Sequence, residues 1–264
     1  MNNSPDLPKP SSEPPLKTSL TDNGQYPEFC QNASQDPALF ENFRRNPIYN
    51  AALEHDSFEQ GLEYLEYAKK VKRFDSHLEE FKKNDLIGNP MTFEYEPYGK
   101  IAPPTLRYLK VLSDIETHIG NLDNAKICEI GTGYGGLCRI ICSYFQVAEY
   151  NLLDLPPVLS LVQKYLSHFE INTTIKYLDV SRLPNQEYDL VISNYAFTEL
   201  RRDIQENYLQ NVILKSKKGY ITYNDINPKD FNSYTLEELK AIIPNLQVFK
   251  EIENTHPKDC MLIW

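Results

Sequence analysis

The sequence has 264 residues, a formal net charge of −10, 41% hydrophobic residues and 24% charged residues. These values predict a globular protein with one sizeable domain and an appendage. The acidic balance argues against binding to nucleic acid or to an anionic membrane, because both require an excess of Lys and Arg. No apolar run approaches the roughly 18 residues of a membrane span, and the N-terminus lacks the pattern of a signal peptide.

The five cysteines form an odd, scattered set without a C-x-x-C pair. This favours reduced thiols and a cytoplasmic location. Cys138 and Cys142 lie four residues apart on an expected helix, and we interpret them as packing residues. The sequence shows no dedicated cluster of metal ligands, so we expect no metal site.

The N-terminal part divides into a tail and a helical region. Residues 1–26 are rich in proline and polar residues and predict a disordered tail. Residues 27–120 are expected to form a helical cap, with a short helix at Asp36–Arg45 that Pro37 opens. Apolar residues at spacings of three and four predict one amphipathic helix over Ser57–Lys83.

Glycines and prolines interrupt the helical pattern over residues 84–104. This segment predicts a long ordered loop, and Phe93, Tyr95 and Tyr98 lie within it. The three aromatic side chains either contact a ligand or anchor the loop to the core, and the sequence leaves both alternatives open. Thr105–Ile119 is again expected to be helical.

From residue 121 to the end, strand patterns alternate with helix patterns. The predicted strands are 126–130, 149–153, 174–178, 188–193, 218–223, 246–252 and 259–264, and the predicted helices are 135–146, 156–169, 199–214 and 235–242. Such alternation predicts an α/β fold, with a mostly parallel sheet covered on both faces. The last two strands are joined by a short turn and predict a terminal antiparallel hairpin.

A glycine-rich turn follows the first of these strands, in "KICEIGTGYGG", Lys126 to Gly136. Its glycines satisfy both G-x-G-x-x-G, a dinucleotide pattern, and (D/E)-x-G-x-G-x-G, a pattern of proteins that bind S-adenosylmethionine. Glycine permits a close backbone approach to a ligand, and the next helix begins with unpaired N–H groups. Either cofactor would suit such a turn, so the glycines alone do not distinguish them.

Acidic residues end the next two strands. Asp154 follows the last glycine, Gly136, by 18 residues, close to where nucleotide-binding folds place an acid for the ribose hydroxyls. Asp179 ends the third strand, and Ser193-Asn194 end the fourth. Together with the terminal hairpin, these positions resemble class I S-adenosylmethionine-dependent methyltransferases, in which an acid like Asp179 commonly faces the adenine amino group.

The resemblance extends to "NDLIGNP", "GKIAPPTLRYLKVLSDI", "CEIGTGYGGLCRI", "LLDLPPVL" and "GYITYND". These stretches resemble the sugar O-methyltransferase family of class I enzymes, from about residue 40 to the end. The resemblance implies a seven-stranded Rossmann-like sheet over residues 121–264, S-adenosylmethionine as cofactor, and a sugar acceptor such as a nucleotide sugar, a glycan or a glycosylated product. Only residues 84–110 are specific to the sugar subgroup.

The resemblance also implies site residues. The expected cofactor-binding residues are Glu129, Gly131, Gly133, Asp154, Leu155, Asp179, Val180 and Asn194. Four of them have a structural alternative: Glu129 as an acid behind the glycine loop, Asp154 as a helix cap, Asp179 as a loop-stabilising acid and Asn194 as a strand-end cap. Asn89, Tyr95 and Tyr98 are expected to bind the sugar, through aromatic faces and an amide.

Methyl transfer to a hydroxyl needs alignment and is assisted by a general base within hydrogen-bond reach. The candidates near the carboxyl ends of the strands are Glu199 and His256, whose imidazole titrates near neutral pH. Asn224-Asp225 also follow a strand. Glu199 with Asp225 could instead contribute to a divalent metal site, although we do not expect one.

Two other functions are weighed against this hypothesis. A NAD-dependent sugar-modifying enzyme of the short-chain type requires a Tyr-x-x-x-Lys pair, but Tyr165, Tyr195 and Tyr208 are followed four residues later by Phe, Glu and Val. A non-catalytic binding module with the same fold would not need both the glycine turn and Asp154. Oligomeric state is left open.

Overall fold

The structure is a computed structural model that describes residue 19 and residues 24–183, 185–251 and 259–264. Its α-helices are α1 (Gln25–Gln35), α2 (Pro37–Glu41), α3 (Pro47–Leu53), α4 (Phe58–Ala68), α5 (Phe74–Lys82), α6 (Pro103–Asp114), α7 (Gly136–Tyr144), α8 (Pro156–Leu166), α9 (Arg202–Asn211) and α10 (Leu236–Ile242). Its strands are β1 (Phe93–Tyr95), β2 (Gly99–Ile101), β3 (Lys126–Ile130), β4 (Glu149–Asp154), β5 (Thr174–Asp179), β6 (Tyr188–Asn194), β7 (Ser216–Tyr223), β8 (Gln247–Lys250) and β9 (Cys260–Ile263). Short 3-10 helices span Phe43–Arg45, Lys83–Leu86, Val180–Arg182, Phe197–Glu199, Ile213–Lys215 and Lys229–Phe231, and a π-helical turn spans Ile115–Ile119.

The main sheet has seven strands in the order β5-β4-β3-β6-β7-β9-β8. The first five are parallel, β9 is antiparallel to β7, and β8 is antiparallel to β9. Because β3 to β7 are parallel, the carboxyl ends of these strands meet at one edge. The strand order and the antiparallel ending are those of the class I methyltransferase fold, so the fold predicted from the sequence is confirmed.

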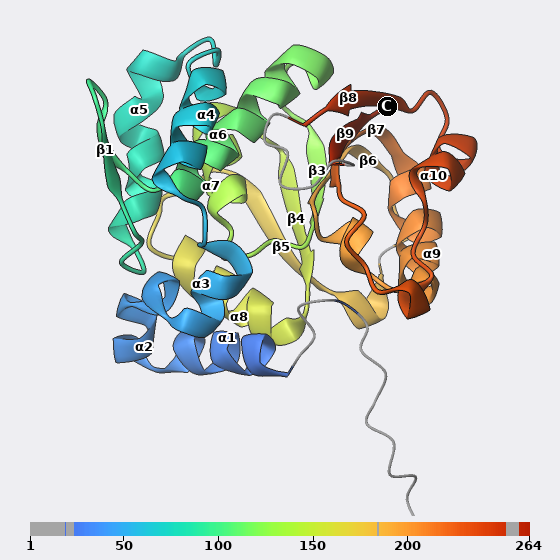
Figure 1. Ribbon diagram of the computed structural model, residues 1–264, viewed down its shortest axis with the longest axis horizontal. Helices are drawn as coiled ribbons and strands as arrows, with labels where there is room; N and C mark the ends of the chain where they lie inside the picture. The colour runs from blue at the N-terminus through green and yellow to red at the C-terminus, as the bar shows by residue number, and fades with distance from the viewer. Residues whose placement is uncertain (1–18, 20–23, 184, 252–258) are drawn as a thin grey trace, which may run out of the picture.

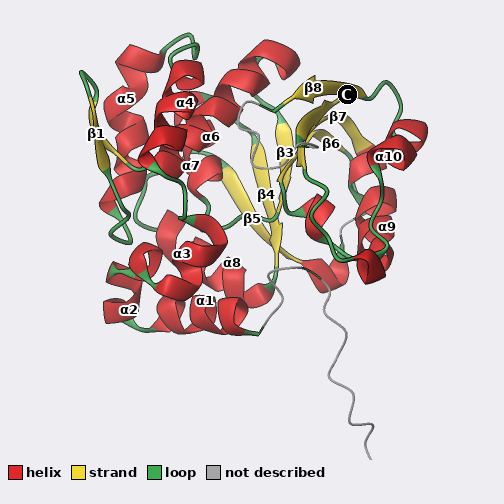
Figure 2. Cartoon of the chain, viewed as in Figure 1, coloured by secondary structure: helices red, strands yellow, loops and turns green. Residues whose placement is uncertain are grey.

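Helices cover both faces of this sheet, as Figures 1 and 2 show. Adjacent residues of β3 illustrate why the strands read as continuous apolar runs: Ile127 packs in the core beneath α6, α7 and α8, whereas Cys128 packs in the core beneath α9 and α10. Both side chains are fully buried. A strand buried on both faces has no polar alternation, which is why the central strands β3, β4 and β6 are recognisable by their apolar composition.

Helix starts in this half follow local chemistry that the sequence displays. Pro156 opens α8 at its first turn. Thr235 accepts a hydrogen bond from the N–H of Glu238, while the side chain of Glu238 accepts one from the N–H of Thr235, which completes a capping box before α10. In the cap, Pro37 likewise opens α2, with Asp36 as its N-cap.

The prediction of one helix over Ser57–Lys83 is wrong, because α4 and α5 are separate helices. Four basic residues lie between positions 69 and 73, and the chain there bonds to distant groups. The N–H of Lys72 donates to Glu116 Oε2 at 2.9 Å, and Arg73 Nη2 donates to the carbonyl of Tyr144 at 2.6 Å. Tertiary bonds therefore replace helical ones, although the apolar spacing continues across the break.

The segment 84–104, expected to be a loop, contains a two-stranded hairpin in which Phe93 pairs with Ile101 and Tyr95 with Gly99. Figure 1 shows this hairpin beside α5. The helix α1 begins at Gln25, inside the segment 1–26 predicted as a tail; residues 1–18 and 20–23 of that segment lie outside the described residues. Within it, Ser19 forms an isolated antiparallel bridge with Leu200.

Candidate cofactor and active site

The glycine turn leaves the carboxyl end of β3 and enters α7. Gly131 and Gly133 have φ angles of 75° and 53°, in the left-handed region that residues with a Cβ rarely adopt. A Cβ on Gly131 would lie 2.0 Å from the Cβ of Ala196, and one on Gly133 would lie 3.3 Å from Leu53 Cδ1. The turn therefore requires glycine for two reasons: its backbone conformation, and the lack of space for a Cβ beneath Ala196 and Leu53.

Three carboxylates lie at or near the ends of the three strands around this turn. Glu129 is in β3, Asp154 is the last residue of β4, and Asp179 is the last residue of β5. Asp154 and Asp179 are register partners in the parallel pair. A ligand that crosses this edge would meet carboxylate oxygens, which accept hydrogen bonds from hydroxyl and amino groups.

Asp154 connects β4 to the glycine turn. Its Oδ2 accepts hydrogen bonds from the N–H of Thr132 at 2.7 Å and from the Thr132 hydroxyl at 3.3 Å, and its Oδ1 accepts one from the N–H of Leu155 at 2.7 Å. Burial raises the pKa of Asp154 to about 6, and these hydrogen bonds oppose the shift. The carboxylate thus holds the turn in place and also lies where the sequence predicts a ribose acceptor.

Glu129 is only 2% exposed, and its Oε2 accepts a hydrogen bond from the Tyr150 hydroxyl at 2.8 Å. Burial raises its pKa to about 8, Tyr150 opposes the shift, and the charge of Asp154 adds to it. This position behind the turn agrees with the alternative in which Glu129 supports the glycine loop. Its predicted contact with the cofactor stays a prediction.

The remaining predicted cofactor residues lie along the same edge. Asp179 Oδ1 accepts the N–H of Ser181 at 2.8 Å and so caps the short 3-10 helix that Val180 begins. Leu155 and Val180 are half-buried and pack against the two core clusters, one on each face of the sheet. The ends of β4 and β5 therefore each carry an acidic residue followed by an apolar residue.

Asn194 ends β6, and its Oδ1 accepts a hydrogen bond from the Thr222 hydroxyl at 3.1 Å. The next residue, Tyr195, has a φ of 62°, which is uncommon for a bulky residue. Such strained positions cluster at functional sites. Sequence reasoning missed Tyr195 because backbone conformation at a non-glycine residue leaves no compositional signal.

The N-terminal cap lies over the turn. Leu53, at the end of α3, approaches Gly133, and the Tyr108 hydroxyl of α6 would lie 3.9 Å from a Cβ at the same glycine. Helix α1 packs on α8, and burial raises the pKa of its Tyr26, with contributions from Cys30 and Asp154. Figure 1 shows α1, α2 and α3 together at the end of the molecule that holds α8.

A buried ionic cluster fixes the cap to the turn. Arg44 is fully buried; its Nε donates to Glu54 Oε1 at 2.7 Å and its Nη1 lies 3.4 Å from Asp85 Oδ1. Its guanidinium lies 4.5 Å from the ring centroid of Tyr134, a residue of the glycine turn. Asn84 Nδ2 donates to the carbonyl of Gly136 at 3.1 Å.

Asp85 also binds the start of α6, because its carboxylate accepts the N–H of Ala102 at 2.8 Å and the Thr105 hydroxyl at 2.7 Å. Burial raises the pKa of both Glu54 and Asp85, and Arg44 opposes that shift. Sequence reasoning missed this cluster. The polar residues Asn84 and Asp85 of "NDLIGNP" bond to the starts of α7 and α6, and they stand out in the sequence as polar residues beside a helix start. Nothing in the sequence indicates that they lie beside Arg44.

Of the two predicted general bases, the structure describes one. Glu199 is half-buried, and its Oε1 accepts a hydrogen bond from Asn224 Nδ2 at 2.8 Å. Asn224 Oδ1 in turn accepts the Thr198 hydroxyl at 3.1 Å. Burial raises the pKa of Glu199, Asn224 opposes the shift, and the charge of Asp259 adds to it. His256 lies outside the described residues.

The predicted sugar-binding residues do not gather around the turn in the described contacts. Tyr95 is 1% exposed and stacks on Phe58 at a centroid distance of 5.2 Å. Tyr98 makes an edge contact with Phe74 at 5.4 Å. Asn89 Nδ2 donates to Asn42 Oδ1 at 2.8 Å. These contacts agree with the alternative in which the aromatic residues anchor the segment.

The residues around the turn fit S-adenosylmethionine chemically. Asp154 and Asp179 supply acceptors for hydroxyl and amino groups, and Gly131 and Gly133 supply backbone that no Cβ blocks. Among the described residues, no group of three or more His, Cys, Asp or Glu side chains could hold a metal ion. No helix within the described residues is long and apolar enough to cross a membrane.

No family model matches the sequence, and no curated protein matches it. The resemblance to the sugar O-methyltransferase family therefore stays a prediction. Among solved structures, the chain is similar to magnesium protoporphyrin IX methyltransferase of Synechocystis PCC 6803 with bound S-adenosylmethionine, at 14% identity over 60% of this chain and 76% of that chain, with a TM-score of 0.46. It is also similar to the N-methyltransferase NodS of Bradyrhizobium japonicum WM9 in complex with S-adenosyl-L-homocysteine, at 12% identity over 60% of this chain and 83% of that chain, with a TM-score of 0.42. At these identities the likeness concerns the fold alone.

Proposed function

We propose that this protein is an S-adenosylmethionine-dependent methyltransferase and that it methylates a sugar hydroxyl. The observation that carries the first part is the glycine turn hydrogen-bonded to Asp154 at the neighbouring strand end, within a sheet of this order. Class I folds bind their cofactor at the carboxyl ends of the central strands, and this arrangement occupies that edge. The sugar acceptor rests on the resemblance of residues 84–110 to the sugar subgroup.

Different described residues bind different parts of the cofactor. Asp154 accepts the ribose hydroxyls, Asp179 accepts the adenine amino group, and the N–H groups of the glycine turn hold the methionine carboxylate. Glu129, whose Oε2 accepts a hydrogen bond from the Tyr150 hydroxyl, accepts the amino group of the methionine. S-adenosylmethionine, when bound, supplies an electrophilic methyl group, so the protein needs to align the acceptor and exclude water.

Glu199 is the described candidate for the general base. Its hydrogen bond from Asn224 orients the carboxylate, and its raised pKa brings its basicity nearer to neutral pH than that of an exposed glutamate. His256 remains the alternative base. Asn89, Tyr95 and Tyr98 stay the predicted contacts of the acceptor. Alanine variants of these residues should raise the KM for the acceptor and leave the affinity for the cofactor unchanged.

Thermal unfolding with added ligands tests the cofactor. S-adenosylhomocysteine at about 100 times its Kd should stabilise the protein by roughly 2.7 kcal/mol, whereas NAD and NADP should leave the midpoint unchanged. A shift with NAD and none with S-adenosylhomocysteine would refute the assignment. Transfer of a labelled methyl group to nucleotide sugars, free sugars and non-sugar alcohols then tests the acceptor, and labelling of the non-sugar alcohols alone would refute its sugar class.

A further inference from the structure

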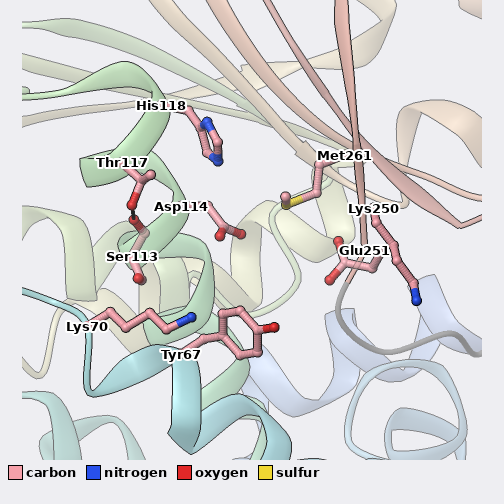
Figure 3. Close-up of a pocket in the computed structure, with 9 residues that line it drawn as sticks. All are labelled: Tyr67, Lys70, Ser113, Asp114, Thr117, His118, Lys250, Glu251 and Met261. Carbon is pink, nitrogen blue, oxygen red and sulfur yellow. Dashed lines mark hydrogen bonds between the residues drawn. The ribbon is translucent and has the colours of Figure 1, made fainter.

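A cavity of about 330 Å³ opens between the C-terminal half of α6, the end of α4, and the β8–β9 pair. Nine described residues line it: Tyr67, Lys70, Ser113, Asp114, Thr117, His118, Lys250, Glu251 and Met261 (Figure 3). None of them belongs to the glycine turn or to the ends of β3, β4 and β5. The volume lies at the lower end of the range for small-ligand sites.

The floor of the cavity is a buried charge cluster. Lys110 is 2% exposed, and its ammonium donates to Glu251 Oε1 and lies 2.9 Å from Asp114 Oδ2. The Tyr220 hydroxyl donates to the same Asp114 oxygen at 2.9 Å. Burying three charged side chains costs free energy that apolar residues in the same space would not cost, so such clusters are frequent at functional sites.

The helix that forms one wall changes its geometry at the cavity. After Asp114, α6 becomes a π-helical turn over Ile115–Ile119, closed by a hydrogen bond of 2.8 Å from the Gly120 N–H to the Ile115 carbonyl. Thr117 and His118 lie in this turn and line the cavity. Short π-helical segments are found frequently at functional sites, where they redirect side chains that a regular helix would present elsewhere.

Floor and mouth differ in charge. Ser113, Asp114, Glu251 and Met261 are buried, whereas Lys70, Thr117 and Lys250 are exposed. The ammonium of Lys70 lies 3.8 Å from the ring centroid of Tyr67, which holds it beside the opening. In Figure 3, Asp114, Glu251 and His118 point toward the middle of the cavity from different sides. The site therefore has hydrogen-bond acceptors at its base and cations at its rim.

We propose that this cavity is a second ligand site, separate from the cofactor turn, and that it binds a small polyol carrying an anionic group. The polyol hydroxyls donate to the carboxylates of Asp114 and Glu251 and bond to Ser113, while Lys110 compensates the charge of the floor. The anionic group, a phosphate or a carboxylate, lies at the mouth, where Lys70 and Lys250 supply positive charge.

Isothermal titration calorimetry with three probes tests the site on the full chain. Glucose 6-phosphate should bind saturably, inorganic phosphate more weakly, and glucose without detectable heat. The double variant Lys70→Gln/Lys250→Gln should weaken glucose 6-phosphate at least tenfold. Both lysines are exposed, so these substitutions leave the fold intact. Lys240→Gln, on α10 at the other face of the sheet, is the matched control and should bind like the parent.

Asp114→Asn tests the floor, and it should remove the preference for glucose 6-phosphate over phosphate. Saturating S-adenosylhomocysteine should leave the affinity of glucose 6-phosphate unchanged, since the two sites share no residue. Absence of saturable binding, equal affinity for phosphate and glucose 6-phosphate, competition by S-adenosylhomocysteine, or unchanged affinity in the double lysine variant would each overturn the proposal. Because the probes need no cofactor, this result is independent of whether S-adenosylhomocysteine binds.

Discussion

The sheet and the N-terminal cap bury their interiors in different ways. In β3, Ile127 and Cys128 face the two opposite cores, and both contact apolar neighbours. In the cap, the fully buried Arg44 holds Glu54 and Asp85. Apolar burial depends on area and not on direction, whereas a buried ion pair stabilises only when its partners meet in the right geometry. The sheet is thus encoded by local pattern, and the cap by contacts between distant residues.

This difference has a consequence for the cofactor turn. The turn is bound from the sheet side by Asp154 and from the cap side by Arg44, which lies over Tyr134, and by Asn84, which donates to Gly136. The sheet side can form as soon as β3 and β4 pair. The cap side requires residues some 50 to 90 positions apart in the chain to meet, so we expect the cap to determine how firmly the turn is held.

The largest effect is expected from Arg44→Leu, which leaves Glu54 and Asp85 buried without the guanidinium that pairs with both. Removal of one partner from a buried ion pair costs about 3–5 kcal/mol, and denaturant unfolding should show that loss. Arg201→Leu, which breaks the exposed pair with Asp203, is the matched control and should change the free energy of unfolding far less. Equal losses in the two variants would contradict the distinction between cap and surface.

The next effect concerns the sheet side and its pH dependence. Glu129 has a pKa of about 8 in the folded state because burial disfavours its charge, so folding favours the neutral carboxyl. The stability that this group contributes is complete below the ordinary glutamate pKa and is lost as the pH rises through 8. Glu129→Gln stays neutral, and already at pH 7 it should be more stable than the parent by on the order of 3 kcal/mol.

Unfolding free energies measured at pH 5, 7 and 9 test this. The control is Asp189→Asn, near the amino-terminal end of β6. There the hydrogen bond from Lys217 lowers the pKa of the Asp189 carboxyl group. Its contribution is present above the ordinary aspartate pKa and is lost as the pH falls, so its pH dependence has the opposite sign. A Glu129→Gln variant that follows the parent at every pH would show that Glu129 is not buried as a neutral group.

The elements of the sheet were predictable because their signals are local. Each predicted strand from 126 onward lies within two residues of an observed one, and the capping box at Thr235 and the prolines at 156 and 157 mark helix starts directly. The cap was less predictable. Apolar spacing continues through the break between α4 and α5, and the bonds that cause it come from Glu116 and Tyr144.

Some residues of the candidate site, like the strands, were predictable from local sequence, and others were not. The glycine turn and Asp154 were found because the conformation and the charge each demand particular residue types at fixed spacing. The role of Tyr95 was not decidable, since an aromatic side chain suits either a ligand or a core, and only the fold puts it against Phe58. Arg44 could not be found, because its partners lie 10 and 41 residues away along the chain.

Within the active site, Glu199→Gln should lower kcat by on the order of 10²-fold if Glu199 is the base, with unchanged affinity for S-adenosylhomocysteine. Burial raises the pKa of Glu199, so the rate should rise with pH through a limb above the usual glutamate range, and the variant should lose that limb. Rates with the sugar acceptor, compared with those of His256→Ala, decide between the two bases. Parental rates in both variants would exclude both residues.

The smallest effect is expected from Asp154→Asn, which tests whether the sheet side alone recognises the cofactor. A charge-assisted hydrogen bond to the ribose contributes about 1.5–3 kcal/mol, so calorimetry should show S-adenosylhomocysteine binding weakened more than tenfold. The pKa of Asp154 is about 6, and the carboxylate binds hydroxyl donors best when ionised, so parental affinity should increase as the pH rises through 6. The asparagine variant should lack this dependence, because its amide does not titrate there. Asp189→Asn, at the amino-terminal edge, should keep both the affinity and its pH dependence. An Asp154→Asn variant with parental affinity would remove Asp154 from the cofactor site and leave it only its bonds to Thr132 and Leu155.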